Sequence, residues 1–274
     1  MNATIAPNSG GLGQNKSVIG IASLAWAGKR GYWTAMGHAD LHVHTTSSDG
    51  MMSAAMVLNY VAVNTSLDVL AITDHNTLDG WLRARDFKEA PANDHLAELD
   101  LVPGIEVSSL DGHVIGLWVE KMIPRDMSAA ETVAAIHEQG GLALSPHPYA
   151  WLPGLREFAG VGSKFLTLPF DAVECRNSTP TETFNNCRTV WMNRRRSSPI
   201  AEYGGSDAHF LWAISRTWTE FPGRGASALR KALERKQTRA RGLTWGPISL
   251  WHYYRDKTRW RKFCSEHNVR LHDL

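Results

Sequence analysis

The stretch "ADLHVHTTSSDG", residues 39–50, places two histidines and an aspartate close together at the end of a strand-like segment. On a β-strand, residues two positions apart point to the same side, so His42 and His44 are expected to face one way. The pair Asp49-Gly50 predicts a turn that brings its carboxylate back toward them. Imidazole and carboxylate together suit Zn²⁺, Mn²⁺ and Fe²⁺. The stretch is therefore interpreted as a ligand-bearing strand end and the loop after it.

The same kinds of side chain recur near the ends of other predicted strands, in "ITDHN", "PGIEVSS", "GHVIGLW", "LSPHPYA" and "GGSDAH". Because the carboxyl ends of parallel strands meet at one face of a sheet or barrel, these groups are expected to converge. With the opening stretch they make up the predicted metal ligands: His42, His44, Asp49, His75, Glu106, His113, His147, Asp207 and His209. Asp74, beside His75, is interpreted as a residue that orients a neighbouring imidazole from outside the coordination shell.

A single histidine is weak evidence for a metal, because one imidazole near a strand is usually a satisfied polar group or a surface residue. The remaining histidines are interpreted in that way: His38, His95, His137, His252, His267 and His272. The predicted ligands exceed the roughly three or four groups that one ion needs. A carboxylate such as Glu106 can bridge two ions, so the sequence predicts two or three divalent metals, with Mn, Zn or Fe as candidates. Such metals activate a shared water for displacement at phosphorus.

The pattern around these motifs alternates strand-like with helix-like segments, which predicts an α/β fold with a parallel sheet. Strands are expected at residues 38–44, 67–74, 99–109, 112–120, 142–147, 171–177 and 201–209. Helices are expected at residues 53–64, 79–90 and 128–141, in a basic segment between the last two strands, and at residues 228–242. Ser128 with Glu131 predicts a capping box for the third of these helices.

The composition of the chain argues against several classes of protein. The 274 residues carry a net charge of +2, too mild to indicate nucleic-acid or membrane binding by charge alone. Three widely spaced cysteines speak against a disulfide scaffold and favour a reducing, cytoplasmic setting. Residues 16–28 loosely resemble a signal peptide, but the apolar run is broken, so residues 1–37 are interpreted as an irregular leader. Residues 38–242 would then form the folded domain, and residues 243–274 a basic-aromatic extension.

In this order, the motifs "ADLHVHTTSSDG", "LAITDHNTLDG", "PGIEVSS…GHVIGL", "LSPHPY" and "GGSDAH" resemble those of the PHP (polymerase and histidinol phosphatase) family, from about His38 to Pro222. The resemblance implies a distorted (β/α)7 TIM-like barrel with a trinuclear metal centre and phosphoesterase activity. It implies that a metal-bound hydroxide attacks phosphorus, with no side-chain nucleophile. By similarity, the three metals would be held by His42, His44, Glu106 and Asp207; by Glu106, His113 and His147; and by Asp49, His75 and His209.

The spacing of the motifs resembles the compact, stand-alone members of this family. His113 and His147 are only 34 residues apart, which leaves no room for the large insertion often found in members that act on nucleotides or RNA. A small phosphorylated metabolite is therefore an expected substrate, and a nucleotide is less favoured by this feature.

Four residues are candidates for substrate binding: Arg176, Asn177, Arg216 and Tyr149. An arginine at the mouth of the barrel could hold a phosphate through two hydrogen bonds. The alternative for the arginines is a structural role at the barrel edge, and the alternative for Tyr149 is packing beneath a loop.

The extension after Gly242 is rich in Trp, Tyr and Arg, a combination found in proteins that bind single-stranded nucleic acid but also in amphipathic contacts with partners or membranes. Three hypotheses follow. The first is a metal-dependent phosphoesterase acting on a small phosphorylated metabolite or nucleotide. The second is a 3′ or 5′ exonuclease that trims RNA or DNA ends with the help of the extension. The third is a non-catalytic PHP module, which the full ligand set disfavours.

Overall fold

The computed structural model describes residues 35–151 and 159–246 and, beyond these, residues 249, 251, 254–256, 258, 259 and 262. The chain divides into Met1–Trp33 and Thr34–Leu274, and only the latter unit contains described residues. The predicted leader, with its signal-like stretch at 16–28, thus falls almost wholly outside the described residues. So does most of the predicted extension at 243–274.

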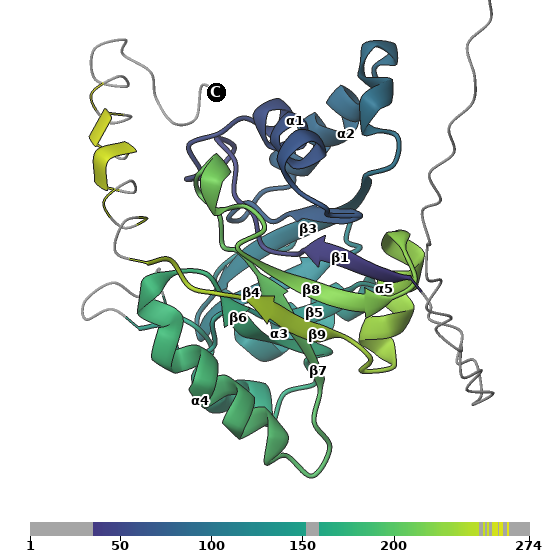
Figure 1. The fold of residues 1–274 in the computed structure, drawn as a ribbon. Helices are drawn as coiled ribbons and strands as arrows, with labels where there is room; N and C mark the ends of the chain where they lie inside the picture. Colours follow the sequence, from purple (N-terminus) through teal and green to yellow (C-terminus); the bar gives the residue numbers. More distant parts are fainter. Residues whose placement is uncertain are drawn as a thin grey trace, which may run out of the picture. The chain divides into compact units, whose positions relative to one another are not determined.

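The described region is built around one nine-stranded sheet with helices outside it (Figure 1). The strands are β1 Met36–Asp40, β2 Val69–Ile72, β3 Asp100–Ser109, β4 Gly112–Leu117, β5 Leu142–Ser145, β6 Ala172–Asn177, β7 Ala201–Gly205, β8 Thr217–Pro222 and β9 Arg239–Gly242. The α-helices are α1 Ala54–Asn64, α2 Asp79–Glu89, α3 Ala129–Glu138, α4 Thr183–Arg194 and α5 Gly225–Glu234. Short 3₁₀ helices are η1 Pro91–Leu96, η3 Gly162–Leu166, η4 Pro180–Glu182 and η5 Leu211–Ala213.

The sheet runs in the order β7-β6-β5-β4-β3-β2-β1-β8-β9. Strands β1, β2 and β3 are mutually parallel, as are β5, β6 and β7. The predicted parallel sheet is present in these two groups of strands, but β4 pairs antiparallel with both β3 and β5, and β8 pairs antiparallel with β1 and β9. The tight turn between β3 and β4 leaves no room for a crossover helix, so this pair forms a hairpin.

The two ends of the sheet approach each other, so that it is nearly closed into a barrel. Threonine hydroxyls join β7 to the other end. Thr219 Oγ1 accepts a hydrogen bond from Gly204 N at 3.0 Å, and Thr217 Oγ1 donates to Gly205 O at 2.6 Å. A Cβ on Gly204 would collide with the backbone oxygen of Trp218, so this close approach requires glycine. The expected distorted barrel is thus confirmed, with side chains rather than a backbone ladder at its seam.

Local sequence signals explain where the helices begin. Ser53 caps α1 by accepting a hydrogen bond from Met56 N. Ser128 and Glu131 form the predicted capping box of α3, in which the side chain of each bonds the backbone N–H of the other. Because these caps satisfy otherwise unpaired N–H groups, they fix the first turn of each helix.

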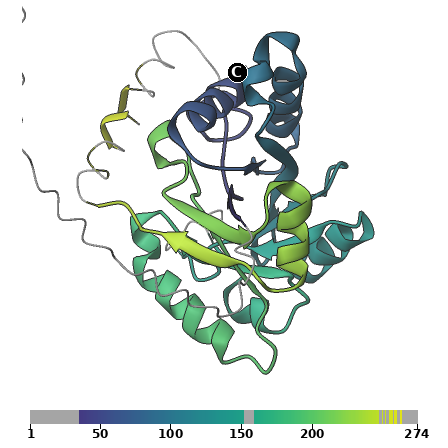
Figure 2. The same cartoon turned by 45° about the vertical axis from the view of Figure 1, so that its right-hand side comes forward.

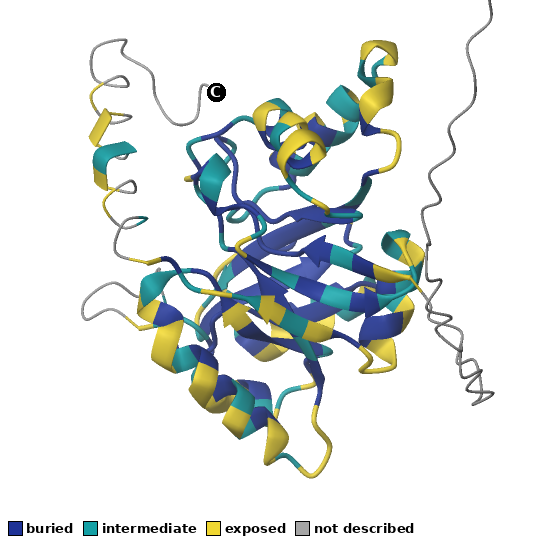
Figure 3. Ribbon diagram, in the orientation of Figure 1, coloured by how far each residue is buried: buried dark blue, intermediate teal, exposed yellow. Residues whose placement is uncertain are grey.

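The strands carry the buried core, while the helices bury one face and expose the other, as α4 shows (Figure 3). Helix α5 packs against the strands, with Leu229, Ala232 and Leu233 buried (Figure 2). Among the described residues, every helix is too short or too polar to traverse a lipid bilayer.

Two regions near the end of the domain differ from expectation. The helix expected at residues 228–242 ends at Glu234, and residues Arg239–Gly242 form strand β9. Strand β8 was also missed, although its residues alternate between buried and half-buried positions. The sequence "RKQTRARG" is polar enough to continue a surface helix, but as an edge strand its side chains are exposed or half-buried.

Candidate metal centre

His42 and His44 lie just beyond β1, on a segment that continues its direction without belonging to the regular strand. Strand β1 ends at Asp40, and Val43 forms an isolated parallel bridge with Ala208. His44 N donates to Ala208 O at 3.0 Å, and on the other side Thr73 N donates to Val43 O at 2.9 Å. The extended backbone preserves the predicted side-by-side placement of the two imidazoles.

The other segments are tied together in the same way. His75 forms a parallel bridge with Glu106, because Glu106 N donates to Asp74 O at 3.1 Å and Asn76 N donates to Glu106 O at 2.8 Å. Glu106 lies within β3 rather than at its end, and His113 stands on the antiparallel partner β4. Glu106 and His113 thus come from the two strands of one hairpin.

Two of the predicted ligands have backbone conformations that L-residues seldom adopt. Asp207 has a φ of +53° and His147 a φ of +23°. Such residues cost about 1–3 kcal/mol each and cluster at functional sites. They are held by the hydrogen bonds of their own backbones, since Asp207 N donates to His42 O at 2.8 Å and His147 N donates to Glu174 Oε2 at 2.7 Å.

The two oxygens of Glu106 face different groups of imidazoles. Oε1 lies 3.0 Å from His113 Nδ1 and 3.2 Å from His147 Nε2. Oε2 lies between 3.3 and 3.4 Å from nitrogens of His42, His44 and His75. A carboxylate with this placement has the geometry of a group shared between two ligand sets.

The other two carboxylates complete the cluster. Asp207 Oδ1 lies 3.3 Å from His44 Nε2 and 3.5 Å from His42 Nε2. Asp49 Oδ2 lies 3.1 Å from His209 Nε2. Ligand atoms within 4.8 Å of one another define overlapping sets that together contain all nine predicted residues: His44, Asp49, His75 and His209; His42, Glu106 and His147; His42, His44 and Asp207; and His75, Glu106 and His113.

Burial gives the cluster an inner and an outer side. The side chains of His42, His44 and Glu106 are at most 1% exposed. Asp49, His75 and His209 are exposed by 45%, 24% and 27%, respectively. A substrate would therefore reach the cluster from the side of these three residues.

Several imidazole nitrogens of the cluster are buried without a hydrogen bond from the described residues. His44 and His113 each have both ring nitrogens buried without a hydrogen-bond partner among the described residues, and His75 Nδ1 shares this property. A buried nitrogen left in this state costs about 1–3 kcal/mol. Because several of these nitrogens nevertheless lie close to carboxylate oxygens, the donor set fits divalent cations placed between them.

The charges in the cluster are strongly coupled. Although burial alone would lower it, the adjacent carboxylates of Asp207 and Glu106 raise the pKa of His44 to about 10. Burial would raise the pKa of Glu106, but His113 and His42 hold it well below its usual range. Burial lowers the pKa of His75 to about 4. The carboxylates thus stay ionised, as a cation site requires.

Glu174 is a site residue that sequence reasoning missed. It is buried in β6, and its Oε1 lies 3.0 Å from His42 Nδ1. A hydrogen bond there fixes the ring of His42 and directs Nε2 toward the cluster. The register of β6 shifts between Glu174 and Arg176, and this irregularity lets both Glu174 and Asn177 face inward. A lone acid in the apolar strand "AVECRN" was the available signal.

Glycine is required beside Glu174. A Cβ added to Gly205 would lie 2.5 Å from the Cβ of His42 and 2.6 Å from Glu174 Oε1. A side chain at Gly205 would therefore push apart the pair that orients His42. Asp40 also supports this region, because its buried carboxylate accepts hydrogen bonds from Ser206 N and Ser215 N, both at 2.9 Å.

Asp74 has a different partner from the one predicted. Its carboxylate accepts hydrogen bonds from Thr45 N and Thr45 Oγ1, both at 2.7 Å, and from Ser48 Oγ at 2.6 Å. Asp74 therefore positions the loop that leads from His44 to Asp49 instead of orienting an imidazole.

The candidate substrate residues on β6 separate into two environments. Asn177 is buried, and its Nδ2 donates to Glu174 Oε2 at 2.9 Å and to Asp207 Oδ2 at 3.1 Å. It thus positions two acids of the centre. Arg176 is exposed on the opposite side of the strand from these contacts.

Arg216 and Tyr149 also make structural contacts. Arg216 is exposed, and its Nε donates to Trp212 O at 3.3 Å. Tyr149 packs edge-on against Phe165, with the guanidinium of Arg188 3.8 Å from the centre of its ring. These contacts correspond to the structural alternatives weighed for both residues.

Comparison with known proteins adds sequence relatives. A family model described as PHP-associated matches residues 195–238. An uncharacterized protein of Methanocaldococcus jannaschii is 32% identical over 151 residues, which cover 51% of this chain and 81% of that protein. A 5′-3′ exoribonuclease of Salmonella typhimurium is 35% identical over 126 residues, covering 44% of this chain and 41% of the enzyme. A phosphoribosyl 1,2-cyclic phosphate 1,2-diphosphodiesterase of Eggerthella lenta is 37% identical over 91 residues, covering 31% and 32%.

Solved structures share the fold. A two-domain protein of Bacteroides vulgatus, containing a predicted PHP-like metal-dependent phosphoesterase, superposes with a TM-score of 0.58 at 17% identity. The alignment covers 77% of this chain and 66% of that one. The protein PsfC of Pseudomonas syringae superposes with a TM-score of 0.59 at 18% identity, covering 82% of this chain and 99% of its own.

Proposed function

Since this chain belongs to the PHP family, we propose that it is a hydrolase of phosphate esters that works with two or three divalent metal ions held by the nine clustered residues. In the reaction, a phosphate ester and water yield an alcohol and phosphate. A small phosphorylated metabolite or nucleotide is the proposed substrate, and Mn, Zn or Fe are the proposed ions.

The observation that carries the proposal is the convergence of six imidazoles and three carboxylates in one cluster, with several buried ring nitrogens left without hydrogen bonds among the described residues. When bound, divalent ions would lower the pKa of a water molecule and offset negative charge on the phosphate oxygens. The relatives whose names state an activity cleave phosphate esters. The complete ligand set also disfavours a non-catalytic module.

The residues of the chain divide the remaining tasks by position. Glu106 would hold two ions together from the buried side, and Glu174 would orient His42 by accepting from Nδ1. The half-exposed Asp49, together with His75 and His209, would face the incoming ester. Because the inner ligands are almost inaccessible, the substrate would meet the centre from the side of these three residues.

The test is a panel of phosphate esters, assayed with metal-free protein and after addition of Mn²⁺, Zn²⁺ or Fe²⁺. We expect activity with at least one ion, and a loss of more than about 100-fold in His42→Ala and Asp207→Ala. His95→Ala is the matched control, because His95 is exposed and contacts Asn59 away from the centre. Full turnover in both ligand variants would refute the catalytic assignment.

A second candidate function is exonuclease action on RNA or DNA ends, favoured by the similarity to the Salmonella exoribonuclease. This hypothesis predicts release of mononucleotides from single-stranded oligonucleotides, with affinity that falls as salt rises. Deletion of the residues after Gly246 should weaken that affinity if the extension contributes. Hydrolysis of phosphomonoesters without any release of mononucleotides would favour the first function.

A further inference from the structure

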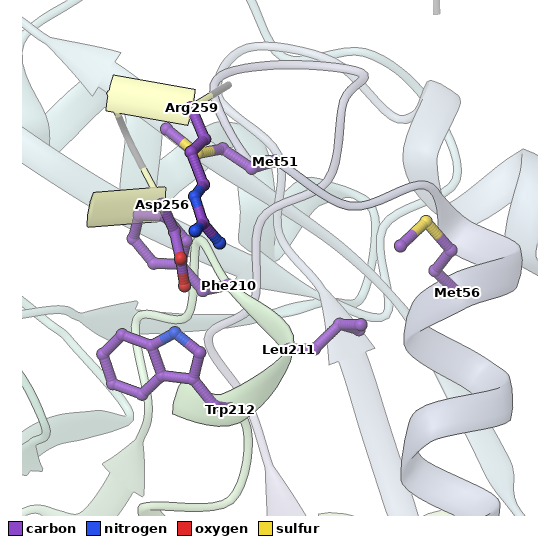
Figure 4. Close-up of a pocket in the computed structure, with 7 residues that line it drawn as sticks. All are labelled: Met51, Met56, Phe210, Leu211, Trp212, Asp256 and Arg259. Carbon is purple, nitrogen blue, oxygen red and sulfur yellow. The ribbon is translucent and has the colours of Figure 1, made fainter. Parts of the chain in front are cut away.

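A pocket of about 440 Å³ lies between the loop after Asp49, the segment after His209 and the C-terminal residues (Figure 4). This volume is within the range of small-molecule sites, roughly 300–1,000 Å³. Its lining residues are Met51, Met56, Phe210, Leu211, Trp212, Asp256 and Arg259.

Two residues of the pocket wall are close in the chain to exposed ligands of the metal centre. Met51 follows Asp49 by two positions, and Phe210 follows His209 directly. Met51 N donates a hydrogen bond to His209 O at 2.9 Å, so the two walls are tied to each other and to two predicted ligands. Asp49 and His209 are also among the exposed ligands of the centre. The organic portion of an ester bound at the centre would therefore lie beside this pocket.

The inner wall offers flat apolar surfaces in a fixed arrangement. The rings of Phe210 and Trp212 are stacked, with centroids 5.6 Å apart and an angle of 14°. Trp245 meets Trp212 edge-on at 4.9 Å, and its own Nε1 is anchored by a hydrogen bond to Ser178 Oγ. Aromatic walls of this kind stack with planar rings.

The pocket also carries polar groups that an aliphatic chain would leave unused. Trp212 Nε1 is buried without a hydrogen-bond partner among the described residues, so an unsatisfied donor lies within this wall. Asp256 and Arg259 come from the helical residues after 246 and line the same pocket as Phe210 and Trp212 (Figure 4). A heteroaromatic ring, with polar atoms at its edge, matches this combination better than a purely apolar group.

We propose that this pocket binds the flat aromatic ring of the ester substrate, with a nucleobase as the chemical class that fits both its faces and its polar edge. Asp256 and Arg259 then form one wall of the substrate site. This inference rests on the proposed function, because it assigns the non-reacting portion of the same substrate.

The experiment compares two esters that differ only in the base, thymidine 5′-monophosphate and 2-deoxyribose 5-phosphate, in the full-length protein. In Met56→Glu and Trp212→Ala, we expect the ratio of their kcat/KM values to fall by about tenfold, mainly through KM for the nucleotide. Met122→Glu and Trp191→Ala are matched controls, since both residues are exposed and neither lines the pocket. An unchanged ratio in both pocket variants would overturn the inference while leaving the hydrolase function intact.

A binding measurement separates this inference from the proposed function. Thymidine and 2-deoxyribose are titrated calorimetrically into metal-free protein. Tighter binding of thymidine that is lost in Met56→Glu supports the pocket even if no ester is hydrolysed, and equal binding of the two overturns it. As a further arm, an equal loss for 4-nitrophenyl phosphate in Met56→Glu would assign the pocket to aryl esters in general, and a loss for the nucleotide alone would assign it to nucleobases.

Discussion

At the scale of single residues, Glu174 decides how His42 is presented to the centre. Its carboxylate accepts hydrogen bonds from His42 Nδ1, from the backbone of His147 and from Asn177 Nδ2. If one carboxylate oxygen were replaced by an NH₂ group, this donor would face the donors that now bond Glu174, in a buried space. We therefore expect Glu174→Gln to lower metal affinity by about 10- to 100-fold, measured by competition with a metal-binding dye.

The control for this substitution is Glu202→Gln. Glu202 lies on the neighbouring strand β7, and its carboxylate faces Arg194 at 3.6 Å. The same chemical change at this position should leave metal affinity as in the wild-type protein. Equal metal affinity of Glu174→Gln and Glu202→Gln would contradict the role assigned to Glu174.

The buried carboxyl group of Glu182 should make the stability of the fold depend on pH. Burial raises its pKa from 4.5 to about 7. Between these values the folded protein holds a proton that the unfolded chain has lost. The stability contributed by this proton is therefore complete below pH 4.5 and is lost as the pH rises through 7. Glu182→Gln should remove this dependence and gain on the order of 1–3 kcal/mol relative to wild type between pH 4.5 and 8.

Urea unfolding of the metal-free proteins at pH 5 and pH 8 measures this difference. Glu98→Gln, at an exposed position, serves as the control and should follow the wild-type curve at both values. A constant stability difference between Glu182→Gln and wild type across this range would show that the buried carboxylate does not titrate as expected.

The sequence predicted the gathering of the nine candidate ligands but not the residues that hold them. His42 and His44 are visible because an i, i+2 pair near a strand end has a fixed consequence for side-chain direction. Glu174 and Asn177 stand three positions apart, and they face the same way only because the register shifts between them. No periodicity in the sequence predicts such a register shift. The hydrogen bonds from Thr45 and Ser48 to Asp74 could not be predicted from the sequence pattern either.

At the scale of the elements, Thr219 is expected to contribute to the closing of the barrel. Its hydroxyl accepts from Gly204 N at 3.0 Å and donates to Gly204 O at 2.9 Å. Thr219→Val keeps the shape of the side chain but leaves a buried N–H without this acceptor, at a cost of about 1–3 kcal/mol. Thr219→Ser keeps the hydroxyl and should cost less. Chemical unfolding compares the two, and a valine variant as stable as the serine variant would refute this account.

The elements themselves were predicted best where local chemistry is strong. The capping box at Ser128 and the serine at position 53 mark helix starts that the structure reproduces. Strand β8 was missed because its pairing partner β1 lies far away in the chain, and β9 was missed because its sequence is short and polar. Tertiary contacts determine the secondary structure of such segments, because a polar sequence such as "RKQTRARG" fits both a helix end and an edge strand.

At the scale of the whole molecule, metal binding should add to the stability of the fold. The predicted ligands come from separate segments spread along the chain, so the complete site exists only in the folded protein. An ion at 100 times its Kd would stabilise the native state by about 2.7 kcal/mol. Chelation should then lower the Tm by at least about 5 °C, measured by calorimetry with and without EDTA. In His44→Ala the effect of EDTA should shrink, and an undiminished effect would place the ions elsewhere.

The junction between β7 and β8 is held by threonine hydroxyls, and this affects how the structure opens locally. Hydroxyl bridges such as those of Thr217 and Thr219 can open singly, unlike the continuous ladders between the other strands. Backbone amides at this junction should therefore exchange with solvent deuterium before those of β2 or β3. Asp207 lies two residues after the end of β7, so each brief opening would loosen one wall of the metal centre and give bound ions a route of escape that does not require global unfolding.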